Sequence, residues 1–472
     1  MKEMQQKAET QGTVKENKMG VMPVDKLLIN MSLPMMISML VQALYNIVDS
    51  IFVARIDENA LTAVSLAFPI QTLMVALGVG TGVGINALLS KALGEKDYER
   101  VNKIAENGVF LALVSYIVFL LVGVFATGIF YRTQTQDAAI IAYGEQYLSI
   151  ACCLSMGMYT QFIFERLLQS TGKTIFTMIT QGTGAIINII LDPILIFGYF
   201  GMPKLGVAGA AVATVIGQII AGIFAAVINF KWNEEISLHF KGFRPSGKTI
   251  GNIYAVGVPS IIMQAIGSVM TYGMNRILLG FTSTAAAVFG VYFKLQSFVF
   301  MPVFGLNNGL VPIIAYNYGA GKKDRLVKAI KLSVCYAIGI MLVGVLVFQI
   351  IPGPLLKLFD ASEQMLQIGI PALRIISTHF VLAAFGIVCG SVFQALGNAV
   401  YSMIVSLTRQ LIVLLPAAYL LAQTGDVTKV WWAFPIAELV SVTVSAIFMM
   451  RTNRKVIQHI GEDARLSGID RE

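Results

Sequence analysis

Charged residues are scarce in this chain of 472 residues, because Asp, Glu, Lys and Arg together make up only 13% of the sequence. Soluble domains typically contain about 25% charged residues, so the shortage excludes an ordinary soluble protein. Hydrophobic residues instead account for 56% of the sequence, and the mean hydropathy is +0.74. The chain is therefore predicted to cross a membrane many times and to carry its function inside the bilayer.

Cysteine and histidine are also rare. The four cysteines lie in apolar runs, without the spacing of a zinc site or of a disulfide framework. The three histidines are far apart, and the sequence contains neither an HExxH nor a GxSxG motif. The sequence therefore supports neither an enzyme nor a resident cofactor.

Twelve apolar stretches are present, each long enough to approach or exceed a spanning helix of about 20 residues. They lie at 27–54, 60–90, 104–131, 138–165, 174–198, 205–230, 249–279, 283–316, 327–351, 363–393, 399–422 and 428–451. Lys and Arg are retained on the cytoplasmic side of a membrane. With a cytoplasmic N-terminus, twenty-five of them fall in cytoplasmic segments and five in outer loops. We expect a multi-pass protein of the cell membrane with both termini in the cytoplasm, and this asymmetry explains the net charge of +8 without a nucleic-acid partner.

The two halves of the chain resemble each other at a constant offset of 225 positions. Pro34 matches Pro259, and LLQSTGKTIFTMI (167–179) matches VFQALGNAVYSMI (392–404). Each half holds an even number of helices, so both copies have the same orientation and are related by an axis along the membrane normal. The predicted fold is an all-α membrane protein of twelve transmembrane helices, arranged as two six-helix lobes with pseudo-two-fold symmetry.

Composition divides the chain into five predicted segments. The polar stretch KWNEEISLHFKGFRPSGK separates the two halves and is expected to be a linker. No short apolar region precedes a small-residue cleavage site, so the first helix is expected to act as an uncleaved signal anchor. The segments are a cytoplasmic tail (1–26), an N-lobe (27–230), a cytoplasmic linker (231–248), a C-lobe (249–451) and a second cytoplasmic tail (452–472).

An acid inside a spanning helix is costly, and the first apolar run contains Asp49. At 1.5 Å rise per residue, Asp49 lies about 8 Å and Asp192 about 9 Å from the outer ends of the first and fifth helices. Asn188 precedes Asp192 by one turn on the same helix face. Thr214, on the sixth helix, lies about 14 Å from its outer end. Two carboxylates, an amide and a hydroxyl are thus predicted to converge in the outer half of the N-lobe.

This set of oxygen-rich groups suits a hard cation, either Na⁺ or a proton shared between the acids. Asp49, Asn188 and Asp192 are the candidate Na⁺ ligands, with Thr214 as a further member of the coupling site. An alternative stays open: the two acids could simply cap or hydrogen-bond helix ends near the outer surface, because helix boundaries read from sequence err by a few residues.

The second half has no equivalent acid pair, because the offset places Met274 opposite Asp49 and Ala417 opposite Asp192. Its other ionisable residues are candidates for a substrate cleft. Two alternatives remain: Glu438 of the last helix could form a structural pair with Arg409, and His379 could be an interior group with all its hydrogen bonds satisfied. The candidate cleft residues are Arg276, Lys294, His379 and Glu438.

Several motifs, taken together, resemble those of the multidrug and toxic compound extrusion (MATE) family, over essentially all of 27–451. They are LYNIVDSIFVARI (44–56), GEKD (94–97), GKKD (321–324), LLQSTGK (167–173), NIILDP (188–193), GVAGAAVAT (206–214) and WWAFPIAE (431–438). The resemblance implies two lobes around a V-shaped cleft, and cation-binding positions at Asp49, Asn188, Asp192 and Thr214. One branch of the family keeps acidic ligands in the second lobe, where this sequence has Gln264 and His379, which favours the N-lobe site.

The resemblance also implies a function. We expect a multidrug efflux transporter that exports amphipathic, often cationic compounds by H⁺- or Na⁺-coupled antiport through alternating access, and so contributes to antibiotic resistance. Its expected partners are small organic substrates and membrane lipid, and a monomer is expected. The alternative is a flippase or exporter of lipid-linked saccharides on a related fold, which a continuous row of cations such as Arg276, Lys294 and Arg409 would favour.

Overall fold

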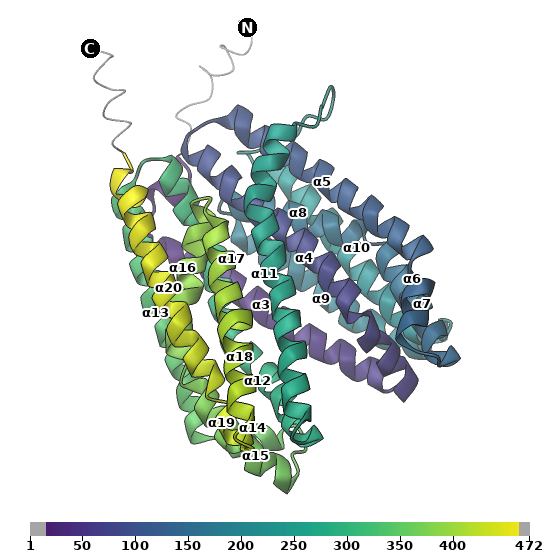
Figure 1. Cartoon of the computed structure of the whole chain (residues 1–472). Helices are drawn as coiled ribbons and strands as arrows, with labels where there is room; N and C mark the ends of the chain where they lie inside the picture. Colours follow the sequence, from purple (N-terminus) through teal and green to yellow (C-terminus); the bar gives the residue numbers. More distant parts are fainter. Residues whose placement is uncertain (1–15, 462–472) are drawn as a thin grey trace, which may run out of the picture.

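The computed structural model describes residues 16–461, and Figure 1 shows two helical bundles that meet at one end and diverge toward the other. The N-lobe follows a short helix, α2 (Lys18–Val21). It comprises α3 (Val24–Ala54), α4 (Glu58–Gly94), α5 (Tyr98–Phe125), α6 (Thr127–Gln134), α7 (Ala138–Cys153), α8 (Met156–Ser170), α9 (Thr174–Phe197), the 3₁₀ turn η1 (Tyr199–Gly201) and α10 (Val207–Trp232).

The C-lobe contains the remaining elements. They are α11 (Gly247–Leu279), α12 (Ser283–Gly319), α13 (Lys323–Ile350), α14 (Pro352–Lys357), α15 (Glu363–Ser377), α16 (Phe380–Ala395), α17 (Ala399–Leu407), the π-helix η2 (Thr408–Leu414), α18 (Leu415–Ala422), α19 (Val427–Val430), α20 (Ala433–Lys455) and the 3₁₀ turn η3 (Ile457–His459). Within 16–461, ten helices are long and apolar enough to cross a membrane, and two bent helix pairs bring the total to twelve. The prediction of a twelve-helix, two-lobe fold is confirmed.

Two predicted spans are not continuous helices. The stretch 138–165 is formed by α7 and α8, which meet at 44°, and the stretch 363–393 is formed by α15 and α16, which meet at 50°. At the second break, the Thr378 hydroxyl donates to the Ile375 carbonyl and the His379 ring bonds the Ile376 carbonyl. Side chains that bond the preceding turn compete with the helical ladder, so this helix ends without a proline or a glycine to mark the break.

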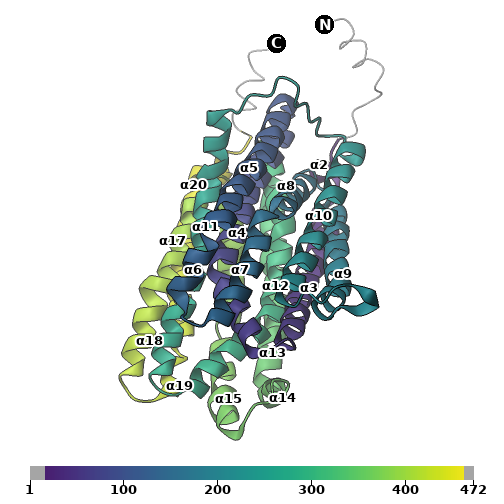
Figure 2. The same ribbon diagram turned by 90° about the vertical axis from the view of Figure 1, so that its right-hand side faces the viewer.

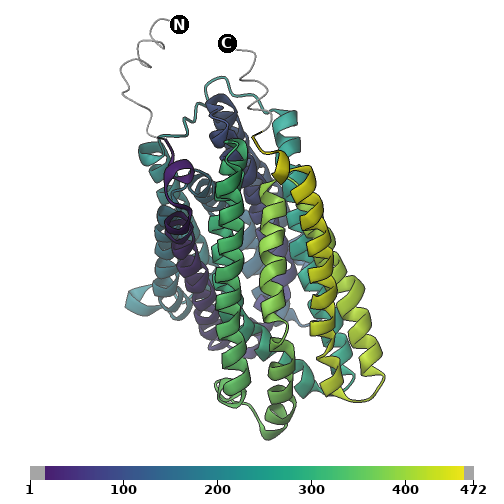
Figure 3. The same cartoon turned by 90° about the vertical axis from the view of Figure 1, so that its left-hand side faces the viewer.

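The lobes pack on each other from the middle of the molecule to the end at which the described chain begins and ends, called here the terminal end. There α4 of the N-lobe packs against α11 and α12 of the C-lobe. A Cβ atom on Gly84 would collide with the Ile253 carbonyl, and one on Gly94 would collide with the Tyr316 carbonyl. Glycine at these positions lets helix backbones approach closely. Figure 3 shows the start of the described chain and the end of α20 at this same end.

The linker between the lobes is non-helical between α10 and α11 and runs across the terminal end of the N-lobe (Figure 2). Three of its backbone N–H groups donate to polar side chains of α5. The acceptors are Asn102, Glu106 and Asn107. These hydrogen bonds fix the linker on the N-lobe.

The predicted tails are partly outside the described residues, since 1–15 and 462–472 are not described. The rest of the first predicted tail is folded, because residues 18–21 form α2 and α3 already begins at Val24. At the other end, α20 continues to Lys455 and is followed by η3.

Candidate cation and substrate site

Three N-lobe helices carry the predicted cation-binding residues. Asp49 lies on α3, Asn188 and Asp192 on α9, and Thr214 on α10, and these three helices pack against one another. The α9 and α10 backbones approach closely because glycine occupies both sides of the contact at 184 and 217. The structure therefore brings all four side chains into one cluster.

Asn188 links the acid on its own helix to the hydroxyl on α10. In the amide orientation that matches donors to acceptors, the nitrogen donates to Asp192 Oδ2 at 3.0 Å and the oxygen accepts from Thr214 Oγ1 at 3.1 Å. Asp192 is fully buried, and its carboxyl group lies within hydrogen-bonding reach of the Asp49 carboxyl. The two acids thus form a contact between α3 and α9, in which Asp192 is fully enclosed and Asp49 is partly buried.

The carboxyl pair is not fully satisfied by the protein. Within the part of the chain that the structure describes, Oδ1 of Asp49 and Oδ1 of Asp192 are buried and have no hydrogen-bond partner. A buried carboxylate oxygen without a partner is costly. A bound proton or a Na⁺ ion would supply the missing interaction, and both fit a donor set made only of oxygen atoms. The capping alternative is disfavoured, because Asp192 caps no helix end and is enclosed by the lobe.

Three neutral side chains near the pair were missed by sequence reasoning. The Tyr45 hydroxyl, one turn before Asp49 on α3, lies within hydrogen-bonding reach of Thr214. Tyr147 of α7 accepts a hydrogen bond from Gln71 Nε2 at 2.9 Å and lies close enough to Asp49 to interact electrostatically. Only the tyrosine on α3 had a signal in the sequence, since it shares a helix face with an acid.

A second buried acid of the N-lobe is Glu165 on α8, at the end of the predicted stretch 138–165. It accepts hydrogen bonds from Gln161 Nε2 at 2.9 Å, Thr180 Oγ1 at 2.9 Å and Gln181 Nε2 at 2.8 Å. Gln181 in turn accepts from Ser38 of α3. Glu165 is therefore the centre of a satisfied polar network that ties α8, α9 and α3 together in the terminal half of the lobe.

The candidate cleft residues of the C-lobe do not gather in one place. Glu438 is 2% exposed and His379 is 6% exposed, so both are enclosed by the lobe in this conformation and line no open surface. Glu438 Oε2 lies 3.6 Å from Arg409 Nη1, the structural pair offered as the alternative. Arg276 and Lys294 are exposed. A substrate contact for any of these four predicted residues stays a prediction.

A two-lobe fold of twelve spans that encloses a pair of acids at a helix contact is the architecture of a polytopic membrane transporter. A family model agrees with it twice. The MatE model matches residues 34–194 and again 259–420, one match in each lobe, and together these cover more than half of the chain. The chain belongs to the MatE family, whose members are transporters and not enzymes.

Known relatives match over most of the chain. The multidrug export protein MepA of Staphylococcus haemolyticus is 29% identical over 416 residues, which are 88% of this chain and 91% of that protein. MepA of Staphylococcus aureus is 28% identical over 425 residues, with the same two shares. A solved structure described as the outward-facing conformation of a multidrug resistance MATE family transporter has a TM-score of 0.89 and 25% identity, and the match covers 96% of this chain and 100% of that one.

Proposed function

We propose that this protein exports small amphipathic, often cationic organic compounds in exchange for H⁺ or Na⁺, by alternating access. The observation that carries the proposal is the Asp49–Asp192 contact, in which each acid has one buried oxygen without a partner. Relatives named as multidrug export proteins, matched over most of their length, support the substrate class. The terminal end is cytoplasmic in this scheme, in a cell membrane, as the distribution of Lys and Arg supports.

The first spanning helix, α3, can transmit the state of the site to the lobe interface. Its outer part carries Asp49, while its inner part packs on α12 of the C-lobe, where the Ser32 hydroxyl donates to the Leu306 carbonyl at 3.1 Å. Two ionised carboxylates in contact repel each other. Binding of a cation removes this repulsion and so favours a closer packing of α3 on α9. A change in that packing alters how α3 meets α12.

Antiport requires that the cation and the drug stabilise different states of the protein, because a ligand with equal affinity for both states shifts nothing. In the proposed cycle, a cation that enters from outside neutralises the acid pair and disfavours the drug-bound state, so the drug leaves. The lobes then close outside and open inside, and the cation leaves to the cytoplasm. The monomer is sufficient for this cycle, since both lobes belong to one chain.

The flippase alternative has less support. Arg409 is engaged with Glu438 at 3.6 Å, and the Lys294 ammonium lies 5.8 Å from the centre of the Phe359 ring. The described side chains therefore offer no continuous row of unengaged cations for a saccharide diphosphate.

Transport in vesicles tests the proposal. The purified protein is reconstituted into the membrane of vesicles. We expect the molecules whose cytoplasmic end faces outward to accumulate a cationic dye in the lumen when an outward-directed H⁺ or Na⁺ gradient is imposed. One ionophore collapses the H⁺ gradient and another collapses the Na⁺ gradient. Accumulation should stop with the ionophore for the ion that drives transport, and the other ionophore should have no effect. Dye accumulation that continues after both gradients are collapsed would contradict ion-coupled antiport.

A further inference from the structure

A short segment before the first spanning helix lies between the two lobes at the cytoplasmic end. It comprises residues 16–22, includes α2 and is called here the clasp. Met19 is fully buried, and a Cβ atom on Gly20 would press on the Tyr316 ring of α12. The clasp is thus packed against the protein, although it belongs to the polar N-terminal stretch, 1–26, that is predicted to be a tail.

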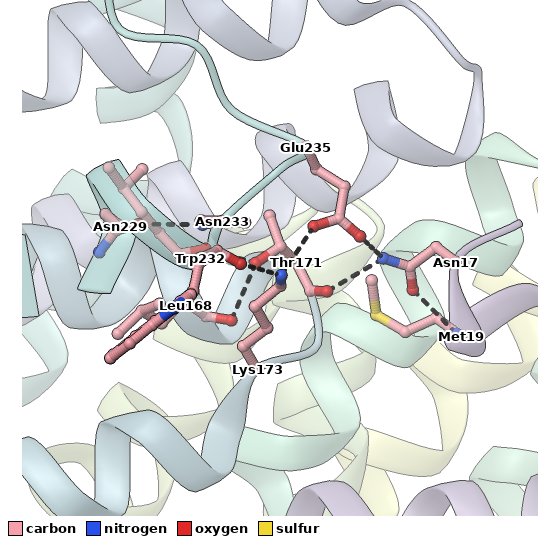
Figure 4. A network of polar contacts seen from close by, with 10 residues as sticks. Asn17, Met19, Leu168, Thr171, Lys173, Asn229, Trp232, Asn233 and Glu235 are labelled. Atoms are coloured by element: carbon pink, nitrogen blue, oxygen red, sulfur yellow. Dashed lines mark hydrogen bonds and ion pairs between the residues drawn. The ribbon is translucent and has the colours of Figure 1, made fainter. Parts of the chain in front are cut away.

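Asn17 attaches the clasp to the N-lobe and to the linker. Its Nδ2 donates to the Thr171 carbonyl at 3.0 Å, in the turn between α8 and α9, and to Glu235 Oε1 at 2.6 Å (Figure 4). The second oxygen of Glu235 lies 3.6 Å from the Lys173 ammonium. Glu235 therefore joins the clasp and the α8–α9 turn through a single carboxylate.

Lys322 attaches the clasp to the C-lobe at the turn between α12 and α13. Its ammonium donates to Glu16 Oε1 at 2.6 Å and to the Gly20 carbonyl at 3.0 Å. The hydrogen bond from Lys322 and its positive charge hold the pKa of Glu16 below its usual value. A lowered carboxyl pKa keeps this pair ionised at neutral pH, and the pair is lost only as the pH falls through the lowered value.

Arg325 makes the second C-lobe attachment. Its Nη2 donates to the Met19 carbonyl at 3.0 Å and to the Met22 carbonyl at 2.6 Å. Asn317 Nδ2 donates to the same Met19 carbonyl at 3.1 Å, and Arg325 Nε also donates to Asn317 Oδ1 at 3.1 Å. Two cations and an amide of the C-lobe thus hold backbone carbonyls of the clasp, and hydrogen bonds from charged donors are stronger than neutral ones.

We propose that the clasp is a latch that holds the two lobes together at the cytoplasmic end, and that it must release one lobe before the transporter opens inward. This one seven-residue segment is hydrogen-bonded to the α8–α9 turn and the linker on one side, and to the α12–α13 turn on the other. Separation of these turns breaks one of the two sets of bonds. The latch rests on the proposed alternating access, but it is independent of the ion that couples.

The distance between the lobes at the cytoplasmic end tests the latch without any drug or ion gradient. In a variant with the four native cysteines replaced, cysteines at the exposed positions Glu99 on α5 and Arg454 on α20 carry nitroxide labels. Pulsed electron spin resonance then gives the distribution of distances. In the otherwise unchanged protein we expect one short distance to dominate. The Lys322→Gln, Arg325→Gln double variant should raise the ratio of long to short distances by about tenfold, because it loses charged hydrogen bonds only from the state in which the lobes are held together.

A matched control and a second variant complete the experiment. Lys331→Gln removes an exposed lysine from the same helix, α13, and should leave the distribution unchanged. Asn17→Ala breaks the hydrogen bonds on the N-lobe side of the latch and should also raise the ratio of long to short distances. It tests the latch if the double variant does not fold. An unchanged distribution in a clasp variant that folds would overturn the latch. If the clasp variants shift the distances but the wild-type protein exchanges dye for neither H⁺ nor Na⁺, the proposed antiport fails and the latch stands.

Discussion

Asp192→Asn is expected to lower ion-driven dye transport by about 5- to 150-fold, the range that corresponds to typical coupling free energies, while the protein stays folded. The amide has nearly the same shape as the carboxyl group and can still accept the hydrogen bond from Asn188. It cannot bind a proton or pair with Na⁺ as a carboxylate does. It also removes the repulsion between two acids in contact, so the melting temperature should be equal to that of the wild type or higher.

The control for this prediction is Asp57→Asn. Asp57 is exposed and caps the start of α4, where its carboxylate accepts from the Ala60 backbone N–H at 2.7 Å. Asparagine is an equally good cap, so this variant should transport at the wild-type rate. Wild-type transport by Asp192→Asn, at wild-type expression, would remove Asp192 from the coupling mechanism.

Gly84→Ala is expected to have the second large effect, because it places a methyl group between the two lobes. The new Cβ atom would collide with the Ile253 carbonyl of α11, which belongs to the backbone and cannot rotate away. Overpacking of this kind costs about 1–3 kcal/mol. The lobes can relieve the collision by separating at the cytoplasmic end, so we expect transport, measured as dye accumulation in vesicles, to fall by about tenfold or more.

Gly251→Ala is the matched control on α11, close to the same interface. A Cβ atom there meets nothing within 4 Å, and alanine favours a helix over glycine by about 1 kcal/mol. This variant should therefore melt at an equal or higher temperature and transport normally. If Gly84→Ala also transported normally, the close contact between α4 and α11 would not be needed for the cycle.

The sequence predicts how deep a residue lies in the membrane, but it predicts less well which residues of other helices lie beside it at that depth. Asp49, Asp192 and Thr214 could be placed at similar levels because helical rise is constant and polar residues mark the helix ends. Tyr147 could not be placed beside them, since the lateral order of helices in a lobe depends on how their faces pack. The side-chain contacts at Thr378 and His379 that end a helix likewise have no distinct sequence pattern.

The clasp shows a different limit. It belongs to an N-terminal stretch, 1–26, that is polar and of mixed charge, which is typical of a tail, and the C-lobe side chains bind it mostly through its backbone carbonyls. A carbonyl group is present at every position, so Met19 and Met22 give no sign in the sequence that Arg325 binds them. Glu165 was missed for a related reason, because its three donors come from two helices that only the fold brings together.

If the Asp49–Asp192 pair exchanges a cation for the drug, the purified protein should release that cation when the drug binds. A saturating cationic substrate is added to the protein in weakly buffered solution, and released H⁺ is followed with a pH indicator and released Na⁺ with the radioactive ion. Exchange at this pair predicts release by the wild type, and substrate binding without release by the Asp49→Asn, Asp192→Asn double variant. Equal release from both proteins would contradict it.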